Sequence, residues 1–247
     1  MISPADRYNY SRFSFGLEAG AFERFLRDAP GLGAFPPPFE LPDLEGRHHR
    51  LADWQGQPVV IEFGSYTCPI FCGHSRAMEQ LSVEHRDAVF VVVYTREAHP
   101  GERVPAHASV ADKARAARRL VDEDAIGRLV LIDDLDGTVH RAFGAMWDAV
   151  FVLAPDGTVE LRRAWNDPGQ IRAALEALRA GERVRVESIE MAPPASSSGF
   201  GHGLLRGGRL ALLDFYTSAP PPVRQRLETS SSAQVREVLA GAAAGRG

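Results

Sequence analysis

Cysteine is scarce in this 247-residue chain, which has only two, Cys68 and Cys72. Two cysteines are too few for the disulfide framework of a small secreted domain. The first residues, MISPADRYNYSRF, lack the basic start and apolar core of a secretion signal. No apolar run approaches the roughly 18 residues of a membrane-spanning helix. We therefore expect a cytoplasmic protein whose reduced cysteines act in catalysis rather than as a structural cross-link.

Positive charge is not in excess either. The 28 Lys and Arg residues are outnumbered by 32 Asp and Glu residues, giving a formal net charge of -4, and Lys113 is the only lysine. Nucleic acids and anionic membranes bind basic surfaces, so neither is an expected partner. The length and the 45% hydrophobic content instead predict one packed domain with appendages.

Strands and helices alternate along residues 39–181. Apolar strand-like runs at 58–63, 88–94 and 129–132 alternate with helical stretches at 69–85, 109–124 and 138–143. The sequence AVFVLAPDGTVELRRA then has the pattern of a β-hairpin, and a last helix begins at Asp167-Pro168 and ends at Gly181. This order, with Cys68 at the first strand-to-helix junction, predicts an α/β protein of thioredoxin-like fold, with a central mixed sheet flanked by helices.

Two appendages flank this domain. Residues 1–38 form an N-terminal extension with scattered aromatic residues and one short helical stretch, AGAFERFLRD, and residues 39–57 then have the pattern of a hairpin. Residues 182–247 are rich in Gly, Ala, Ser and Pro, which predicts a flexible C-terminal tail. Its one apolar run, LALLDFY, is expected either to add a strand or to dock onto the domain.

The segment FGSYTCPIFC combines the end of a strand with the start of a helix. Small residues turn the chain and Pro69 begins the helix, which places Cys68 at the helix N-terminus. Free N–H groups and the helix dipole favour the reactive thiolate there, so we expect an acidic, partly exposed thiol. The alternative is a small buried residue that packs at the turn. Cys72 lies one helical turn on and is either a resolving thiol that forms a disulfide with Cys68 or a core residue of the helix.

Glu97-Ala98-His99-Pro100 directly follows the strand at 88–94. Because the carboxyl ends of neighbouring parallel strands meet at one edge of a sheet, we expect this turn to lie beside Cys68. An imidazole there can protonate a leaving group, and a carboxylate can orient the imidazole. The alternative is a solvated loop without a role.

Together the two segments resemble the iodothyronine deiodinases, which are selenoenzymes of the thioredoxin fold. Their signature is Phe-Gly-Ser-x-Thr, selenocysteine and Pro-x-Phe, with a later Tyr-x-x-Glu-Ala-His-Pro, and this chain reads FGSYTCPIF and YTREAHP. The resemblance implies that Cys68 takes the place of selenocysteine, that His99 is the catalytic histidine and that Glu97 is its carboxylate partner. It also implies an active-site turn shaped by Phe63, Gly64, Ser65, Thr67 and Pro69.

Two features differ from that pattern. Sulfur replaces selenium, and sulfur is the poorer nucleophile toward iodine. Where thioredoxin folds usually place a cis-proline facing the active cysteine, this chain reads Met146-Trp147-Asp148.

The expected function is that of a thiol-dependent oxidoreductase. Cys68 attacks a peroxide, a disulfide or an aryl halide, His99 donates a proton, and Cys72 or an external thiol such as thioredoxin or glutathione restores Cys68. No cofactor and no metal ion is expected. One alternative is a copper chaperone that uses Cys68 and Cys72, with His74 as a further ligand. Another is a thioredoxin-fold binding module without turnover. His48, His49 and His107 are expected at the surface.

Overall fold

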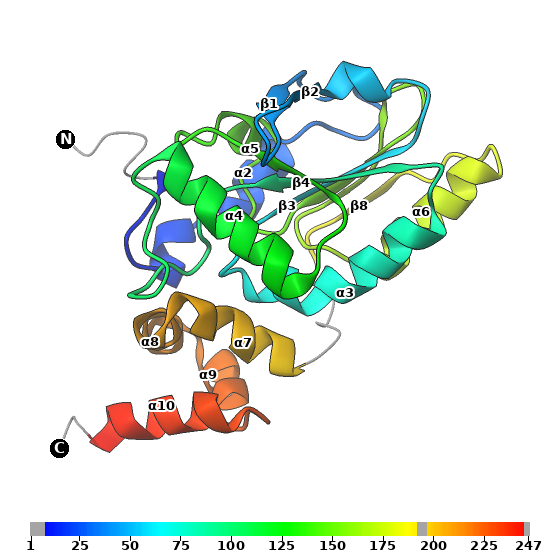
Figure 1. Ribbon diagram of the computed structural model, residues 1–247. Helices are drawn as coiled ribbons and strands as arrows, with labels where there is room; N and C mark the ends of the chain where they lie inside the picture. Colours follow the sequence, from blue (N-terminus) through cyan, green and yellow to red (C-terminus); the bar gives the residue numbers. More distant parts are fainter. Residues whose placement is uncertain (1–7, 192–196, 245–247) are drawn as a thin grey trace.

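The computed structural model describes residues 8–191 and 197–244, so the ends of the predicted extension and tail, and residues 192–196 within the tail, lie outside the described residues. At its centre is a six-stranded mixed sheet in the order β5-β4-β3-β6-β7-β8 (Figure 1). The strands are β3 (Val59–Gly64), β4 (Val89–Tyr94), β5 (Leu129–Ile132), β6 (Val150–Leu153), β7 (Val159–Arg163) and β8 (Val186–Ser188). β3, β4 and β5 run parallel, whereas β6 pairs antiparallel with both β3 and β7. The predicted thioredoxin-like α/β fold is confirmed.

Helices cover both faces of this sheet. On one face, α3 (Pro69–Glu84) and α6 (Pro168–Arg179) pack against Val60 and its neighbours. On the other face, α2 (Ala21–Asp28) and α4 (Val110–Asp124) pack against Ile61 and Phe63. Successive side chains of a strand point to opposite faces, which is why a strand buried on both faces, such as β3, supports a helix layer on each side.

Smaller elements complete the domain. Residues 39–57 form the predicted hairpin, with β1 (Glu40–Pro42) antiparallel to β2 (His48–Arg50), followed by the 3-10 helix η2 (Leu51–Trp54). The short helix α5 (Thr138–Ala142) precedes β6, and the 3-10 helix η1 (Phe15–Glu18) precedes α2. The predicted cap residues are also in place, since the side chains of Ser109 and Asp167 accept backbone N–H groups at the starts of α4 and α6.

The predicted flexible tail is wrong for residues 197–244, which form α7 (Ser197–Gly207), α8 (Arg209–Ser218), α9 (Pro221–Glu228) and α10 (Ala233–Ala244). We call these residues the C-terminal helical unit. LALLDFY forms most of α8, so the run docks as a helix and adds no strand. The strand β8 also comes from the predicted tail and extends the sheet beyond residue 181.

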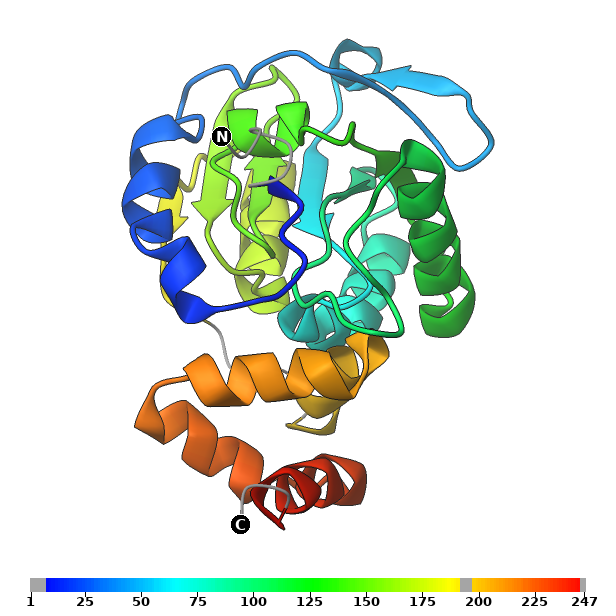
Figure 2. The ribbon, with the colours of Figure 1, turned by 90° about the vertical axis from the view of Figure 1, so that its left-hand side faces the viewer.

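The C-terminal helical unit lies across one end of the domain, with α7 along α3 (Figure 1). Its apolar side chains share a cluster with the N-terminal segment, made of Tyr10, Phe13, Leu204, Leu205, Leu212, Phe215, Ala219, Leu227, Val235 and Leu239. Figure 2 shows the N-terminal segment running between the sheet and α8. None of the helices formed by residues 8–191 and 197–244 is long and apolar enough to cross a membrane.

Candidate active site

The loops that follow β3 and β4 lie side by side, as predicted. Gly64 and Tyr94, the last residues of the two strands, are partners in the parallel ladder, and the N–H of Thr95 donates to the carbonyl of Gly64 over 3.0 Å. Beyond the strands, the N–H of Ala98 donates to Oγ of Ser65 over 3.1 Å. The sheet register therefore holds the segment containing Cys68 next to the segment containing His99.

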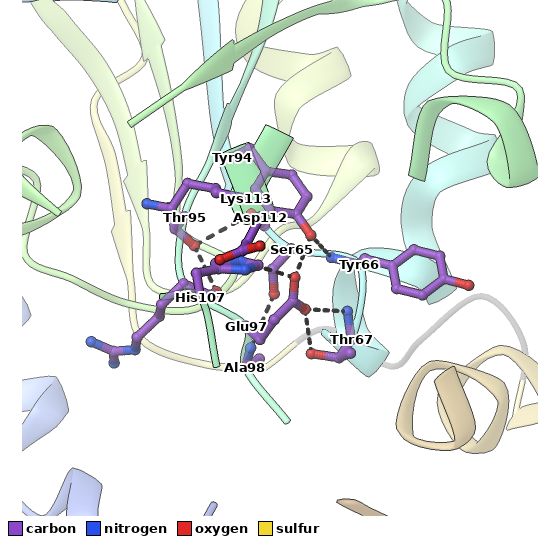
Figure 3. A network of polar contacts seen from close by, with 12 residues as sticks. Ser65, Tyr66, Thr67, Tyr94, Thr95, Glu97, Ala98, His107, Asp112 and Lys113 are labelled. Atoms are coloured by element: carbon purple, nitrogen blue, oxygen red, sulfur yellow. Dashed lines mark hydrogen bonds and ion pairs between the residues drawn. The ribbon is translucent and has the colours of Figure 1, made fainter. Parts of the chain in front are cut away.

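Glu97 joins the two loops through a buried polar network (Figure 3). Its Oε2 accepts the backbone N–H of Thr67 over 2.9 Å and the hydroxyl of Thr67 over 2.6 Å. Its Oε1 accepts the hydroxyl of Tyr94, which in turn accepts the N–H of Tyr66 over 3.0 Å. Oγ of Thr67 also accepts the N–H of His99 over 3.0 Å. Ser65, Thr67 and Glu97 thus tie the backbone directly before Cys68 to the loop that follows β4.

His107 completes this network, and its prediction as a surface residue is wrong. Its side chain is buried, and its Nε2 lies 3.2 Å from Oε1 of Glu97. Burial alone would raise the pKa of Glu97, but the contacts with His107, Thr67 and Tyr94 lower it, so the carboxylate stays ionised. His107 lies outside the recognised motifs, and nothing in its sequence context indicated this contact.

The remaining residues of the predicted active-site turn, Phe63, Gly64 and Pro69, shape the turn through packing and backbone conformation. Phe63 packs in the core, with its ring 5.4 Å from that of His140 and 5.2 Å from that of Phe143. Gly64 is required because a Cβ at this position would come within 2.1 Å of the ring of Phe71. Pro69 is the first residue of α3, as predicted.

Cys68 is the N-cap residue of α3, but the prediction of an acidic, partly exposed thiol is wrong for this structure. The residue is only 2% exposed. Burial raises the pKa of the Cys68 thiol well above its ordinary value, and the nearby carboxyl group of Asp148 and the thiol of Cys72 add to the effect. The backbone N–H groups of Ile70 and Phe71 act in the opposite direction and do not offset burial. In this arrangement Cys68 is a neutral thiol.

The C-terminal helical unit covers this turn. A Cβ at Gly203 of α7 would lie 2.6 Å from Cα of Pro69, so the backbone of α7 packs directly on the residue after Cys68. Ordinary contacts between carbon atoms lie at about 3.5–4.0 Å, so only glycine permits this approach. The helix dipole effect predicted for Cys68 is therefore present, but in a site closed off from water.

His99 is enclosed by aromatic rings from both ends of the chain. The ring of Phe13 lies 4.3 Å from the His99 ring, and the ring of Phe215 in α8 lies 5.2 Å from it. Burial lowers the pKa of His99 to about 3, with a small opposite effect of the charge on Glu97, so the imidazole is neutral near pH 7. Its Nδ1 is buried without a hydrogen-bond partner. The structure does not bear out the prediction that Glu97 orients the His99 ring. The Glu97 carboxylate instead contacts Thr67, Tyr94 and His107.

Cys72 is partly buried in the first turns of α3 and has a cationic neighbour. Nη1 of Arg206 in α7 lies 2.9 Å from Sγ of Cys72. The thiol itself donates to the carbonyl of Tyr66 over 3.5 Å. Burial raises the pKa of Cys72 to about 12, and the charge of Arg206 acts in the opposite direction.

Asp148 occupies the place expected for a cis-proline. The residue is fully buried, its Oδ2 accepts the N–H of Asn166 over 3.1 Å, and its Oδ1 has no hydrogen-bond partner. Burial raises the pKa of Asp148 well above its ordinary value, with a further contribution from Glu62. Burial is the main cause of the neutral Cys68 thiol, and the Asp148 carboxyl group is the next largest.

The proposed copper ligands are not arranged as a metal site. Among the described residues, no group of three or more His, Cys, Asp or Glu side chains is placed to hold a metal ion, and this includes Cys68, Cys72 and His74. His48 is exposed, as predicted, whereas His49 is partly buried and bonds Asp43 through Nε2 over 2.9 Å.

Known proteins with a similar sequence include thyroxine 5-deiodinases. A thyroxine 5-deiodinase of Aquarana catesbeiana is 33% identical over 169 residues, which are 58% of this chain and 62% of that protein. The human thyroxine 5-deiodinase is 32% identical over 130 residues, which are 48% of this chain and 42% of that protein. The chain therefore spans less than two thirds of the length of these relatives.

A solved structure agrees in fold. An uncharacterized conserved protein from Geobacillus kaustophilus superposes with a TM-score of 0.54 at 21% identity, over 65% of this chain and 88% of that one. The model of the iodothyronine deiodinase family matches residues 25–175, which include Cys68, Glu97 and His99. Because this match covers more than half of the chain, the protein belongs to the iodothyronine deiodinase family.

Proposed function

We propose that this protein is a thiol-dependent oxidoreductase in which Cys68 is the nucleophile. The observation that carries the proposal is the position of Cys68 at the N-terminus of α3, beside a loop whose Glu97 and His99 are tied to Thr67, within a family whose curated relatives are deiodinating enzymes. A thiol that only packs at a turn needs neither the two directed N–H groups at the helix start nor a buried carboxylate that holds the adjoining backbone.

A hydroperoxide is the electrophile that the site favours. Cys68 is 2% exposed, so a large disulfide reaches it only if the whole C-terminal helical unit moves, whereas a small peroxide needs a smaller opening. The Cys68 sulfur attacks the terminal oxygen, the S–O bond forms and the O–O bond breaks, which leaves a sulfenic acid and an alcohol or water. His99 relays the proton from Cys68 to the departing oxygen as the O–O bond breaks, because its pKa of about 3 leaves the imidazole neutral and able to accept one proton while it passes one on.

Reductive deiodination is the second candidate, because the family match and the aromatic rings of Phe13 and Phe215 around His99 suit an iodinated aromatic ring. Here the Cys68 sulfur takes iodine from the ring, the proton of Cys68 passes through His99 to the ring carbon, and an external thiol reduces the resulting sulfenyl iodide. Sulfur is the weaker nucleophile toward iodine, so we expect this reaction to be the slower one.

The test compares three substrates with one set of variants. Hydrogen peroxide, a small disulfide and an iodotyrosine-like compound are each assayed with excess dithiothreitol, using the wild type, Cys68→Ser and His99→Ala. We expect peroxide turnover that depends on Cys68. Turnover of none of the three above the dithiothreitol background would refute the enzyme proposal and favour a binding module.

A further inference from the structure

Cys72 and Arg206 form a contact that the reaction at Cys68 does not explain. Arg206 lies in α7, beyond the residues that match the deiodinase family. Its side chain is almost fully buried, and its Nη1 contacts three groups: Sγ of Cys72 at 2.9 Å, the carbonyl of Tyr66 at 3.4 Å and Oδ2 of Asp124 at 3.1 Å. Its Nη2 pairs with the other oxygen of Asp124.

The bidentate pair with Asp124 fixes where this guanidinium points. Asp124 is the last residue of α4, and the ring of Tyr66 packs against the flat side of Arg206, with Cζ 4.5 Å from the ring centroid. A guanidinium held by a carboxylate on one side and an aromatic ring on another has little freedom to turn away from the sulfur. The charge therefore stays directed at Cys72 and is not merely close to it.

We propose that Arg206 is a catalytic residue for the second half of the redox cycle, in which its guanidinium stabilises the thiolate of Cys72 as it attacks oxidised Cys68. This inference rests on the proposed function. In the step, the Cys72 sulfur attacks the sulfur of the Cys68 sulfenic acid, an S–S bond forms, the S–O bond breaks, and the departing hydroxide takes the proton lost by Cys72 to leave as water. Atoms and electrons balance without a further reactant, and an external thiol then reduces the disulfide.

The other charged groups near Cys72 do not provide this stabilisation. The charged groups that act on this thiol are Arg206 from α7, Asp124 from α4, Glu97 from the loop after β4 and Asp148 from the segment before β6. Cys68 lies one turn back, at the N-cap of α3. Asp124, Glu97 and Asp148 each oppose a negative charge on Cys72, and Arg206 alone in this set favours it. Arg206 is thus the residue whose loss makes the thiolate of Cys72 hardest to form.

The experiment follows the resolving step alone. The full-length protein is treated with one equivalent of hydrogen peroxide, quenched at intervals, and analysed by intact mass for the sulfenic acid and for the disulfide. We expect Arg206→Met to form the sulfenic acid as the wild type does but to convert it at least about tenfold more slowly near pH 7.5, because the loss of an adjacent opposite charge moves a pKa by one unit or more. The pH midpoint of the conversion should rise, and Arg206→Lys should restore part of the rate.

Arg119→Met is the matched control. Arg119 also lies against the Tyr66 ring, with Cζ 4.6 Å from the centroid, and pairs with Glu123, but it makes no contact with Cys72. We expect its conversion rate and pH midpoint to equal those of the wild type. If Arg206→Met does not fold because Asp124 is left without a partner, Asp124→Asn/Arg206→Met removes both charges, and the midpoint should still rise, because Arg206 acts on Cys72 more strongly than Asp124 does.

The possible failures are distinguishable. Absence of any Cys68 oxidation in the wild type would refute the proposed function itself. A sulfenic acid that never becomes the Cys68–Cys72 disulfide, or one that is converted at the same rate and with the same pH midpoint in Arg206→Met, would overturn the role of Arg206 and leave the proposed function standing.

Discussion

Gly203→Ala should open the site, because it places one methyl group in the contact between α7 and α3. The new Cβ would lie 2.6 Å from Cα of Pro69, which is backbone and cannot rotate away, so α7 must move by about 1 Å to reach an ordinary contact. Overpacking of this kind costs about 1–3 kcal/mol. This cost falls on the closed arrangement alone, whereas the better helix propensity of alanine stabilises α7 in both arrangements. The opening equilibrium should therefore shift about 5- to 150-fold toward the open form, at about tenfold for each 1.4 kcal/mol.

The assay measures alkylation of Cys68 by iodoacetamide in a Cys72→Ser background. When opening is fast compared with alkylation, the rate is proportional to the open population, so Gly203→Ala should label about 5- to 150-fold faster than the parent. In the parent, the pH midpoint of labelling should lie above the ordinary thiol value of about 8.5. Gly241→Ala is the control, because it adds the same methyl group to α10, where its Cβ meets only a nitrogen of Arg209 at 3.5 Å. Equal labelling of Gly203→Ala and its parent, or a parent midpoint below about 7.5, would refute the closed-site reasoning.

Three further predictions concern the residues beneath the C-terminal helical unit. Cys72→Ser should leave the first oxidation of Cys68 intact and accumulate a sulfenic acid in intact-mass measurements; equal loss of that first reaction in Cys72→Ser and Cys68→Ser would contradict this order. His99→Ala should slow deiodination by about 10²–10⁴-fold and peroxide reduction much less, as measured by single-turnover rates, because a carbon leaving group needs the proton more. Alkaline pH should destabilise the wild type more than a Cys68→Ser/Cys72→Ser variant in urea unfolding. Both thiols have pKa values raised by burial, Cys72 to about 12, so the folded state keeps protons that the unfolded chain releases above about pH 8.5. The difference should grow by up to about 1.4 kcal/mol per pH unit for each thiol, and parallel curves would contradict it.

Local sequence patterns were sufficient to predict the order of strands and helices in the thioredoxin-like domain. Apolar runs, the N-cap residues Ser109 and Asp167, and the turn residues of the hairpins predict the order of strands and helices that the structure has. The placement of the Glu97 loop beside Cys68 also follows from the sequence, because two parallel strands joined by one helix end at the same edge of the sheet. These features depend on short stretches of chain and on rules that hold for every parallel sheet.

The environment of Cys68 was not predictable in this way. Its burial depends on α7, more than 120 residues downstream, in a segment whose Gly, Ala and Ser content is also typical of flexible chain. In the structure these residues form helices instead, and at Gly203 the missing side chain allows α7 to pack directly against the start of α3. His107 and Arg206 were missed for a related reason, since each acts through a partner, Glu97 or Cys72, that is distant in sequence.

The contact between Arg206 and Cys72 bears on the choice between an enzyme and an inactive binding module. Both readings allow a buried, neutral Cys68, because a core cysteine and a protected nucleophile look alike when the site is closed. They differ at Cys72. A cysteine that only packs in a helix gains nothing from a guanidinium 2.9 Å from its sulfur, and burying that charge carries a desolvation cost. The pair with Asp124 offsets part of that cost, and a negative charge on the Cys72 sulfur, the state that a resolving thiol passes through, offsets more of it. The pairing of a cation with the second thiol, from a helix that also closes the site over the first, therefore favours a two-cysteine redox enzyme over a module that has lost turnover.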